Sequence, residues 1–327
     1  MHAIRLHEFG PAENLRYEEI AAPEPGAGQV RIAVAASGVH LIDTAIRSGR
    51  SGGPFPLPEL PTIPGREVAG TVEAVGDGID AGWIGRRAVA HLGMAGGGYA
   101  ERAVVGAASL HEVADHVGAE AAVAMIGTGR TAMGILELAE LTAEDTVVVT
   151  AAAGGIGTLL VQAALRAGAE VVALAGGPEK VARARELGAT VAVDYTDPAW
   201  PEQVRDALDG NPASVAFDSV GGTVGRGAME LLGAGGRLLL FGWSSGEPTP
   251  MSSMDIAGRG ITAIGSLGAR ILQRPGGIRG LEDAALAAVT SGELVPVVDQ
   301  TFALAEAAGA HRALETRATV GKVVLAP

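Results

Sequence analysis

Hydrophobic and polar positions follow two different patterns along this chain, and the change falls near residue 120. Up to that point the apolar residues form short β-rich segments, such as 29–39, 68–76 and 86–93, with Gly, Pro and Asp between them at close spacing. Short segments separated by frequent turn residues are typical of a compact domain made mainly of β-strands. We predict such a domain over residues 1–120.

Beyond residue 120, short apolar runs alternate with stretches of helical spacing. One helical stretch, 179–189, contains Gly188 where a glycine is favoured after a helix. Another is expected over 222–236. Strands that alternate with helices predict an α/β fold with a doubly wound parallel sheet, which we place at residues 121–267. The predicted strands are 146–150, 170–175, 190–194, 214–218, 236–242 and 261–267.

The last part of the chain, residues 268–327, has helical spacing near 280–294 and 304–317 and a final apolar run at 322–326. We expect this tail to return to the first domain. Before it, Gly49–Gly65 is rich in Gly and Pro and is predicted to be a long loop of the kind that often carries binding function.

Length, charge and cysteine usage narrow the class of protein. A chain of 327 residues exceeds the usual size of a single core, so two domains are expected. The net charge of −13 opposes association with nucleic acid or with anionic lipid surfaces. The chain contains no cysteine, which excludes disulfides, a thiolate nucleophile and cysteine-ligated zinc.

The N-terminal sequence "MHAIRLHEFG" has neither the basic nor the apolar region of a signal peptide, so we expect a cytoplasmic protein. Residues 147–165 are uncharged and long enough to suggest a membrane span. The "AAAGGIG" inside that stretch instead favours a buried strand, a turn and a packed helix.

The turn "TAAAGGIG" (150–157) follows an apolar strand and precedes an amphipathic stretch. In a βαβ nucleotide fold, such a turn points free helical N–H groups at a pyrophosphate. Gly154 and Gly155, with Ile156 beside them, allow the backbone to approach phosphate, and Gly157 allows close packing of helix on strand. Ala152 holds the place of the motif's first glycine. The alternative is a tight strand-to-helix corner without a ligand.

The end of the second strand of this sheet favours NADP over NAD. An NAD site usually has an acidic residue there to bind the ribose hydroxyls, but this chain has Ala175. Gly176 and Gly177 follow and leave room for a phosphate, and Lys180 supplies a positive charge. A solvated helix face is the alternative interpretation of Lys180.

With these motifs placed, the sequence resembles the medium-chain dehydrogenase/reductase superfamily, and within it the zinc-free quinone oxidoreductase branch. The resemblance implies a GroES-like catalytic domain, built from both chain ends, and a Rossmann domain between them. The matching stretches cover essentially the whole chain and include "ASGVHLIDTAIRSG", "IPGREVAGTVEAVG", "GGYAE", "GTGRTAMGIL", "EKVARARELGA", "FDSVGG", "LLLFGWSSG" and "LETRATVGKVVL".

The resemblance also implies that no catalytic zinc is bound. Zinc-containing relatives place three ligands at positions that fall here on His40, Arg66 and Gly127. An arginine cannot deprotonate to bind a metal and a glycine has no side chain, so one imidazole remains. Without a metal to polarise an alcohol or ketone, the expected acceptor is activated by its own conjugation.

Further cofactor contacts are implied by the resemblance alone. Tyr195 matches a position near the adenosine phosphate, and Arg317 matches one near the ring region. Along the nicotinamide end the resemblance implies Asp43, Thr131, Ser219, Phe241, Gly242, Ser245, Gly246 and Leu267.

Three positions depart from the pattern of the branch. Ala45 replaces the tyrosine that is often found two residues after the aspartate, which removes one aromatic wall of the quinone site. His40 stands where quinone reductases commonly have asparagine, and an imidazole there can give a proton or a hydrogen bond to the developing oxyanion. A simple polar wall is the alternative. Arg130 either contacts an anionic substrate or forms a local salt bridge.

The expected activity is NADPH-dependent, zinc-independent hydride transfer to a quinone or another activated α,β-unsaturated carbonyl. We take His40 and Thr131 as the candidate catalytic residues, with His40 or water as the source of the proton. The alternatives are an enoyl-thioester or alkenal reductase on the same scaffold, and a dinucleotide-binding protein without catalysis. The resemblance further implies a homodimer formed through the last strand of the Rossmann sheet, 261–267.

Overall fold

The computed structural model describes residues 1–50 and 56–327, and the chain divides into two compact units. One unit contains residues 1–128 and 285–327, so both ends of the chain fold together, and the other contains residues 129–284. Part of the loop predicted over Gly49–Gly65 lies outside the described residues. No helix in the described part of the chain is long and apolar enough to cross a membrane.

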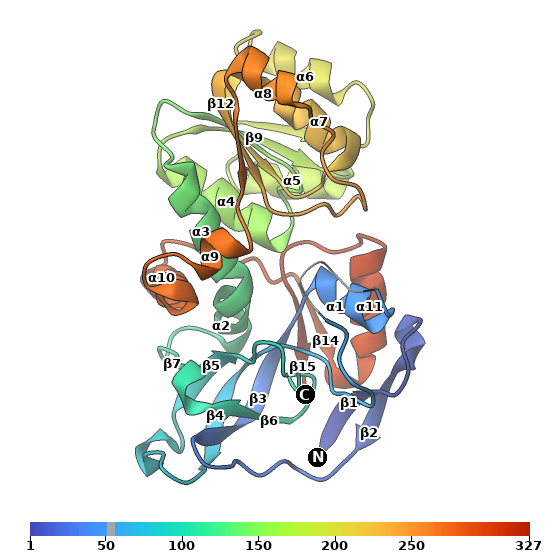
Figure 1. The fold of residues 1–327 in the computed structure, drawn as a ribbon, viewed down its shortest axis with the longest axis vertical. Coiled ribbons are helices and arrows are strands. Elements are labelled where there is room, and N and C mark those ends of the chain that lie inside the picture. Colours follow the sequence, from blue (N-terminus) through green and yellow to red (C-terminus); the bar gives the residue numbers. More distant parts are fainter. Residues whose placement is uncertain (51–55) are drawn as a thin grey trace. The chain divides into compact units, whose positions relative to one another are not determined.

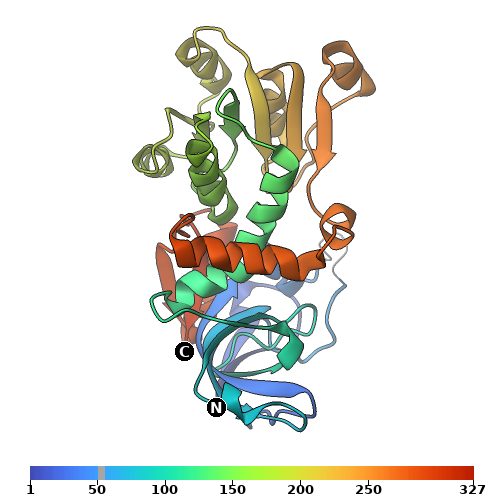
Figure 2. The same ribbon diagram turned by 90° about the vertical axis from the view of Figure 1, so that its left-hand side faces the viewer.

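A seven-stranded sheet forms the centre of the first unit, in the order β14-β15-β3-β4-β5-β7, with β6 paired to β3. The C-terminal strand β15 runs antiparallel to β3, which places the two ends of the chain side by side within this unit (Figures 1 and 2). The strands are β3 (Gln29–Val39), β4 (Glu67–Val75), β5 (Arg87–His91), β6 (Arg102–Gly106), β7 (Leu110–Glu112), β14 (Gln300–Ala303) and β15 (Val323–Ala326).

Alternating apolar residues explain how this sheet builds its core. In β3, the side chains of Val30, Ile32 and Val34 are buried, while the residues between them are partly exposed. A separate hairpin and three helices complete the unit. They are β1 (His2–Leu6), β2 (Leu15–Glu19), α1 (Leu41–Arg47), α2 (Ala119–Ala124) and α11 (Ala307–Glu315).

The second unit contains a six-stranded sheet in the order β10-β9-β8-β11-β12-β13, and every neighbouring pair is parallel. This order has the form 3-2-1-4-5-6, which defines the doubly wound dinucleotide-binding fold and confirms the predicted α/β class. The strands are β8 (Thr146–Val149), β9 (Glu170–Ala175), β10 (Val191–Asp194), β11 (Ala213–Asp218), β12 (Leu232–Leu240) and β13 (Thr262–Gly265).

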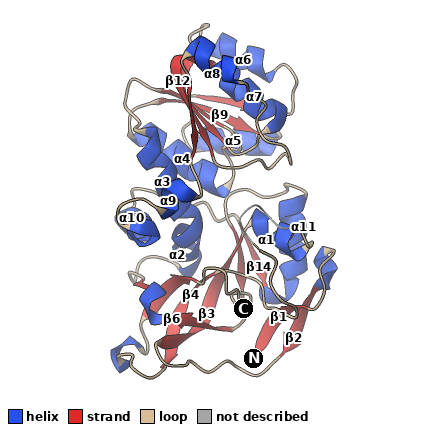
Figure 3. Ribbon diagram, viewed as in Figure 1, coloured by secondary structure: helices blue, strands red, loops and turns tan. Residues whose placement is uncertain are grey.

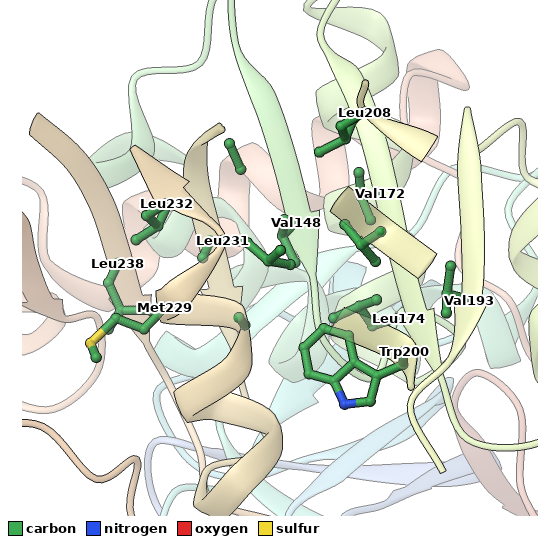
Figure 4. Close-up of a cluster of buried hydrophobic side chains, with 14 of the residues drawn as sticks. Val148, Val172, Leu174, Val193, Trp200, Leu208, Met229, Leu231, Leu232 and Leu238 are labelled. Carbon is green, nitrogen blue, oxygen red and sulfur yellow. The ribbon is translucent and has the colours of Figure 1, made fainter. Parts of the chain in front are cut away.

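Helices flank this sheet (Figure 3). On one face, the indole of Trp200 lies near Leu174 and Val193, and Met229 extends the same apolar cluster toward Leu238 (Figure 4). The helices that begin within this unit are α3 (Arg130–Ala139), α4 (Gly155–Arg166), α5 (Pro178–Glu186), α6 (Trp200–Ala207), α7 (Gly222–Glu230), α8 (Ser253–Arg259), α9 (Ala269–Leu272) and α10 (Gly277–Ser291), the last of which contains the boundary between the units.

One predicted boundary in this unit is wrong. The helix expected over 222–236 ends at Glu230, and β12 begins at Leu232 rather than at residue 236. Three of the next residues, Gly233, Gly235 and Gly236, are glycines, which are poor helix formers. Leu232 instead pairs with Ala213 of β11, so the chain enters the sheet earlier than its apolar pattern indicates.

Candidate active site

The glycine turn joins the carboxyl end of β8 to the first turn of α4. Ala151 adopts a left-handed conformation with φ of 48°, and the Gly154 N–H donates a hydrogen bond of 2.8 Å to the Ala151 carbonyl oxygen. A Cβ atom added at Gly157 would lie only 2.3 Å from that same oxygen, so only glycine allows this approach of α4 to the turn. The first N–H groups of α4 have no partner within the helix, which makes this end of α4 suited to an anion such as a pyrophosphate.

The structure brings Gly176 and Tyr195 together at the carboxyl ends of β9 and β10. A Cβ atom at Gly176 would lie 3.1 Å from the Tyr195 hydroxyl oxygen. Lys180 lies in the first turn of the neighbouring helix α5. These three residues are the group that the sequence assigns to the adenosine phosphate.

Asp194 lies at this end of the sheet, and the sequence analysis missed it. Its Oδ1 atom accepts hydrogen bonds from the N–H groups of Gly177 and Thr196, both 2.9 Å long. Although burial opposes ionisation, these hydrogen bonds lower the pKa of the Asp194 carboxyl. The Gly177 N–H therefore has a partner within the protein, and Gly176, Lys180 and Tyr195 remain as the candidate phosphate ligands.

A buried carboxylate organises the loops that follow β11 and β12. The Oδ1 atom of Asp218 accepts hydrogen bonds from the N–H groups of Val220 (2.9 Å) and Gly221 (3.1 Å) and from the Thr150 hydroxyl (3.1 Å). The Thr150 hydroxyl oxygen in turn accepts a hydrogen bond from the Ser219 N–H. Asp218 is fully buried, so these bonds fix the Ser219 loop to the end of the glycine turn.

The predicted contacts that follow β12 lie against this loop. The Phe241 N–H donates to the Asp218 carbonyl oxygen, and a Cβ atom at Gly242 would lie 3.0 Å from the Ser219 carbonyl oxygen. The Ser245 N–H donates to the Val220 carbonyl oxygen. Ser219, Phe241, Gly242 and Ser245 therefore form one group at the carboxyl edge of the parallel sheet, where ligands of this fold bind.

The remaining predicted residues of the second unit have separate places. Thr131 lies in the first turn of α3, and Leu267 follows β13 with 43% of its surface exposed. Arg130 forms an ion pair of 2.6 Å with Glu282, which matches the local salt bridge that was one of its two expected roles.

In the first unit, Asp43 receives bonds from three directions. The His40 N–H donates to Asp43 Oδ2 at 2.9 Å, and the Tyr99 hydroxyl donates to the same oxygen at 3.2 Å. Arg66 Nη2 lies 3.3 Å from Asp43 Oδ1. Burial, together with the Asp43 charge, raises the pKa of Tyr99 well above its usual value, so its hydroxyl stays a donor. The other predicted residue of this unit, Arg317, has a left-handed φ of 57° after α11.

His40 contacts two residues that the sequence analysis did not select. Its Nε2 atom lies 2.6 Å from Glu67 Oε1 and 2.7 Å from the Nζ atom of Lys322. Lys322 Nζ also donates a hydrogen bond of 2.8 Å to Glu67 Oε2. Burial opposes ionisation of Glu67, but the adjoining His40 and Lys322 outweigh it and hold the pKa of the Glu67 carboxyl well below its usual value.

This group of side chains does not fit a catalytic metal. Of the three positions that match zinc ligands in relatives, only His40 offers a metal-binding atom. A Cβ atom at Gly127 would lie 1.4 Å from Glu67 Oε1, so the Glu67 carboxylate fills the space of the third ligand's side chain. Within residues 1–50 and 56–327, no three His, Cys, Asp or Glu side chains are grouped to hold a metal ion.

A cavity of about 110 Å³ adjoins Asp43 and Arg66 in the first unit. Its lining is mostly apolar and includes Ile46, Ile63 and Met94. Apolar walls with a few polar groups are typical of sites for small organic molecules. The cavity is therefore a candidate binding place for part of an acceptor.

Comparisons with known proteins agree with this architecture. Residues 155–281 match the family described as "Zinc-binding dehydrogenase", and residues 26–115 match "Alcohol dehydrogenase GroES-like domain". A quinone oxidoreductase from Pseudomonas aeruginosa is 32% identical over 99% of both chains, and a 2-haloacrylate reductase from Burkholderia sp is 30% identical over 99% of this chain and 98% of its own. A mycobacterial structure complexed with NADPH is 35% identical over 100% of both chains, with a TM-score of 0.86.

The fold, the glycine turn and these similarities define the class. The chain belongs to the medium-chain dehydrogenase/reductase superfamily, in its quinone oxidoreductase branch, and is an oxidoreductase. The resemblance drawn from the sequence is thus confirmed at the level of family and fold.

Proposed function

We propose that this protein is an NADPH-dependent reductase that transfers hydride to a quinone or another activated α,β-unsaturated carbonyl without zinc. The observation that carries the proposal is the composition of the His40 site. The positions matching zinc ligands hold His40, Arg66 and Gly127, and the nearest positive charge is the Lys322 ammonium, 2.7 Å from His40 Nε2. These side chains do not provide the ligands for a metal that would polarise an alcohol or a ketone.

The second unit offers the groups that would hold the cofactor. The N-terminus of α4, with Gly154, Gly155, Ile156 and Gly157, would bind the pyrophosphate. Gly176, Lys180 and Tyr195 would bind the phosphate that distinguishes NADP from NAD. The mycobacterial neighbour solved with NADPH supports this choice of cofactor.

The nicotinamide end has its own set of candidate residues. The loop group around Ser219, Phe241, Gly242 and Ser245 would position it, and the resemblance adds Thr131, Leu267, Asp43 and Arg317. When bound, the cofactor supplies a hydride. The protein's contribution is to hold the acceptor in line with that hydride and to provide a proton, because proximity and orientation account for much of such a rate enhancement.

Conjugated acceptors suit a site of this kind. Hydride addition to a quinone or an enone places negative charge on an oxygen through the conjugated system, so no metal is needed to stabilise it. The similarity to a 2-haloacrylate reductase supports activated alkenes as a second acceptor class beside quinones. His40, with 24% of its side chain exposed, would protonate the reduced acceptor.

A panel of quinones, α,β-unsaturated aldehydes and enoyl thioesters, offered with NADPH and with NADH in parallel, tests the proposal. We expect oxidation of NADPH, faster than of NADH, with at least one conjugated acceptor and none with simple ketones or alcohols. NADPH binding without oxidation by any acceptor would support the non-catalytic alternative instead.

A homodimer and a cytoplasmic location belong to the same proposal. The strand β13 lies at the edge of the six-stranded sheet and is partly exposed, so it can pair with the same strand of a second copy. Light scattering measures the mass in solution, and a monomer would contradict the dimer.

A further inference from the structure

Arg66 directly precedes β4 and lines the cavity of the first unit that also adjoins Asp43. Its side chain is 12% exposed. The cavity walls around it are mostly apolar, with Ile63 and Met94 among them. Because apolar walls keep the local dielectric low, a positive charge there acts on a bound anion far more strongly than it would in water.

The backbone around Arg66 is held in place by its neighbours. The Arg66 carbonyl oxygen accepts a hydrogen bond of 2.7 Å from the Leu92 N–H, and the Gly65 carbonyl oxygen accepts one of 3.0 Å from the Gly98 N–H. Gly65 has a φ of 89°, and a Cβ atom there would lie 2.3 Å from Tyr99 Cδ1. The Arg66 side chain therefore extends from a fixed segment of backbone.

Asp43 orients the Arg66 guanidinium without engaging the whole group. The contact between Arg66 Nη2 and Asp43 Oδ1 is 3.3 Å long, whereas charge-assisted hydrogen bonds are about 2.7–2.9 Å long. The other carboxylate oxygen of Asp43 accepts hydrogen bonds from the His40 N–H and the Tyr99 hydroxyl. A guanidinium has five N–H groups, so Arg66 can hold Asp43 and donate to a bound molecule at the same time.

Arg47 also lines the cavity, but its surroundings differ. Its guanidinium forms an ion pair with Glu315 and donates a hydrogen bond to the Thr44 carbonyl oxygen. The Arg47 side chain is 3% exposed, compared with 12% for Arg66. Of these two arginines, Arg66 is therefore the more accessible to a bound molecule.

Two neighbouring groups show how the Arg66 charge acts on its surroundings. Burial and the Asp43 charge raise the pKa of Tyr99, and Arg66 acts against them. Burial also lowers the pKa of the Lys322 ammonium, and Arg66 acts in the same direction as burial. Both effects mean that Arg66 favours a negative oxygen and disfavours a second cation in its vicinity.

We propose that Arg66 is a catalytic residue that donates a hydrogen bond to the carbonyl oxygen of the acceptor while negative charge develops on that oxygen. This inference rests on the proposed function, because it needs an acceptor whose carbonyl oxygen becomes an anion. The position of Arg66 matches that of a metal ligand in zinc-containing relatives. The guanidinium supplies a fixed positive charge there, and donors held in place toward a developing oxyanion are a major source of rate enhancement.

The step balances as follows. A hydride brings its electron pair to the β-carbon of an enone. The alkene π pair then joins the α-carbon to the carbonyl carbon, and the carbonyl π pair moves to the oxygen. The acceptor gains the two electrons that the cofactor loses. Arg66 keeps all its protons, because a guanidinium does not release one in a protein. The proton that later joins the α-carbon comes from His40 or from water.

Removal and chemical replacement of the guanidinium test this role by turnover. Arg66→Met removes the charge and keeps a long side chain, whereas Arg66→Ala leaves space for added methylguanidinium. Arg86→Met, which removes an exposed cation of the same unit, is the matched control.

We expect kcat for an enone to fall about 10²-fold in Arg66→Met and Arg66→Ala, with little change in KM, because the lost interaction forms chiefly in the transition state. Methylguanidinium should raise kcat of Arg66→Ala about tenfold, since it restores a charge-assisted hydrogen bond. It should not raise kcat of Arg66→Met, whose side chain occupies the space. Arg86→Met should match the wild type.

A phenol probe measures the preference for an oxyanion without turnover. p-Nitrophenol has a hydroxyl on a conjugated ring, and its phenolate form is yellow. The absorbance of the bound probe against pH gives the ratio of phenolate to phenol affinity, and competition with the enone shows that the probe occupies the acceptor site. This ratio should be about tenfold higher in the wild type than in Arg66→Met, which is the effect of one charge-assisted hydrogen bond.

Wild-type protein alone gives a readout if the variants do not fold, because the bound probe should turn yellow at a lower pH than the free probe. A bound probe that ionises no more readily than the free one would overturn the inference. Full activity in Arg66→Met would overturn it as well, and so would an Arg66→Ala variant that methylguanidinium does not rescue. If the wild type reduces no conjugated carbonyl, the proposed function itself fails, which is a distinguishable result.

Discussion

Gly157→Ala tests the link between the glycine turn and cofactor binding. The added Cβ atom would lie 2.3 Å from the Ala151 carbonyl oxygen and 2.9 Å from the Ala152 Cα atom. The first distance is more than about 1 Å shorter than the ~3.5 Å of an ordinary nonbonded contact. Both atoms belong to the backbone, so no side chain can rotate away and α4 itself must shift.

Overpacking of this kind costs about 1–3 kcal/mol of stability. A shift of α4 would also displace the N–H groups at its N-terminus, and we expect the Kd for NADPH to rise about tenfold, equivalent to about 1.4 kcal/mol. Urea unfolding, followed by the fluorescence of the tryptophans, including the buried Trp200 of the second unit, measures the first effect. Titration of NADPH fluorescence measures the second.

Gly258→Ala is the matched control. Gly258 also lies within a helix, α8, but a Cβ atom there would have no neighbour within 4 Å. This variant should bind NADPH like the wild type and be as stable or up to about 1 kcal/mol more stable. If Gly157→Ala behaved like Gly258→Ala in both assays, the packing argument would be refuted.

Three other substitutions have defined outcomes. Lys180→Ala should weaken NADPH binding about tenfold, because it removes a charge-assisted hydrogen bond to the extra phosphate that is worth about 1.5 kcal/mol. Binding of NADH should not change. Equal losses for both cofactors would contradict a role of Lys180 in binding that phosphate. Burial lowers the pKa of His311 to about 4, so the unfolded chain binds more protons between that pH and about 6.5. The free energy of unfolding should therefore fall as the pH is lowered through this range. His311→Gln should reduce the slope of the free energy of unfolding against pH by up to about 1.4 kcal/mol per pH unit, as measured from denaturation curves. An unchanged slope would contradict the prediction. Glu67→Gln should lower the free energy of unfolding by about 3–5 kcal/mol, because it leaves the Lys322 ammonium buried without its counter-charge. Glu112→Gln, at an exposed position, should leave the free energy of unfolding almost unchanged. Similar denaturation curves for the two variants would contradict a stabilising role of the buried pair.

The secondary structure of the second unit was largely readable from the sequence. The strand predicted at 170–175 coincides with β9, whose residues after the exposed Glu170 are all apolar and buried, as expected for a strand inside a parallel sheet. In the first unit, the segment 29–39 coincides with β3. The early start of β12 was not readable, because its first residues pair through the backbone and include several glycines.

The contacts among His40, Glu67 and Lys322 could not be predicted from the sequence. Glu67 and Lys322 are 255 positions apart, and their contact exists only because the C-terminal strand β15 pairs with β3. The available signal was weak: each is a charged residue at the start of an apolar strand. Asp194 was missed for a similar reason, because its contact with Gly177 requires the pairing of β9 with β10.

Transfer of a label from the cofactor tests the central claim most directly. The protein is treated with a chelator, its metal content is measured, and it is then given NADPH deuterated at the nicotinamide C4 position and an α,β-unsaturated aldehyde. The account predicts undiminished turnover without zinc and deuterium at the β-carbon of the product. Activity that disappears on chelation and returns with zinc, or deuterium that is lost to the solvent, would contradict it.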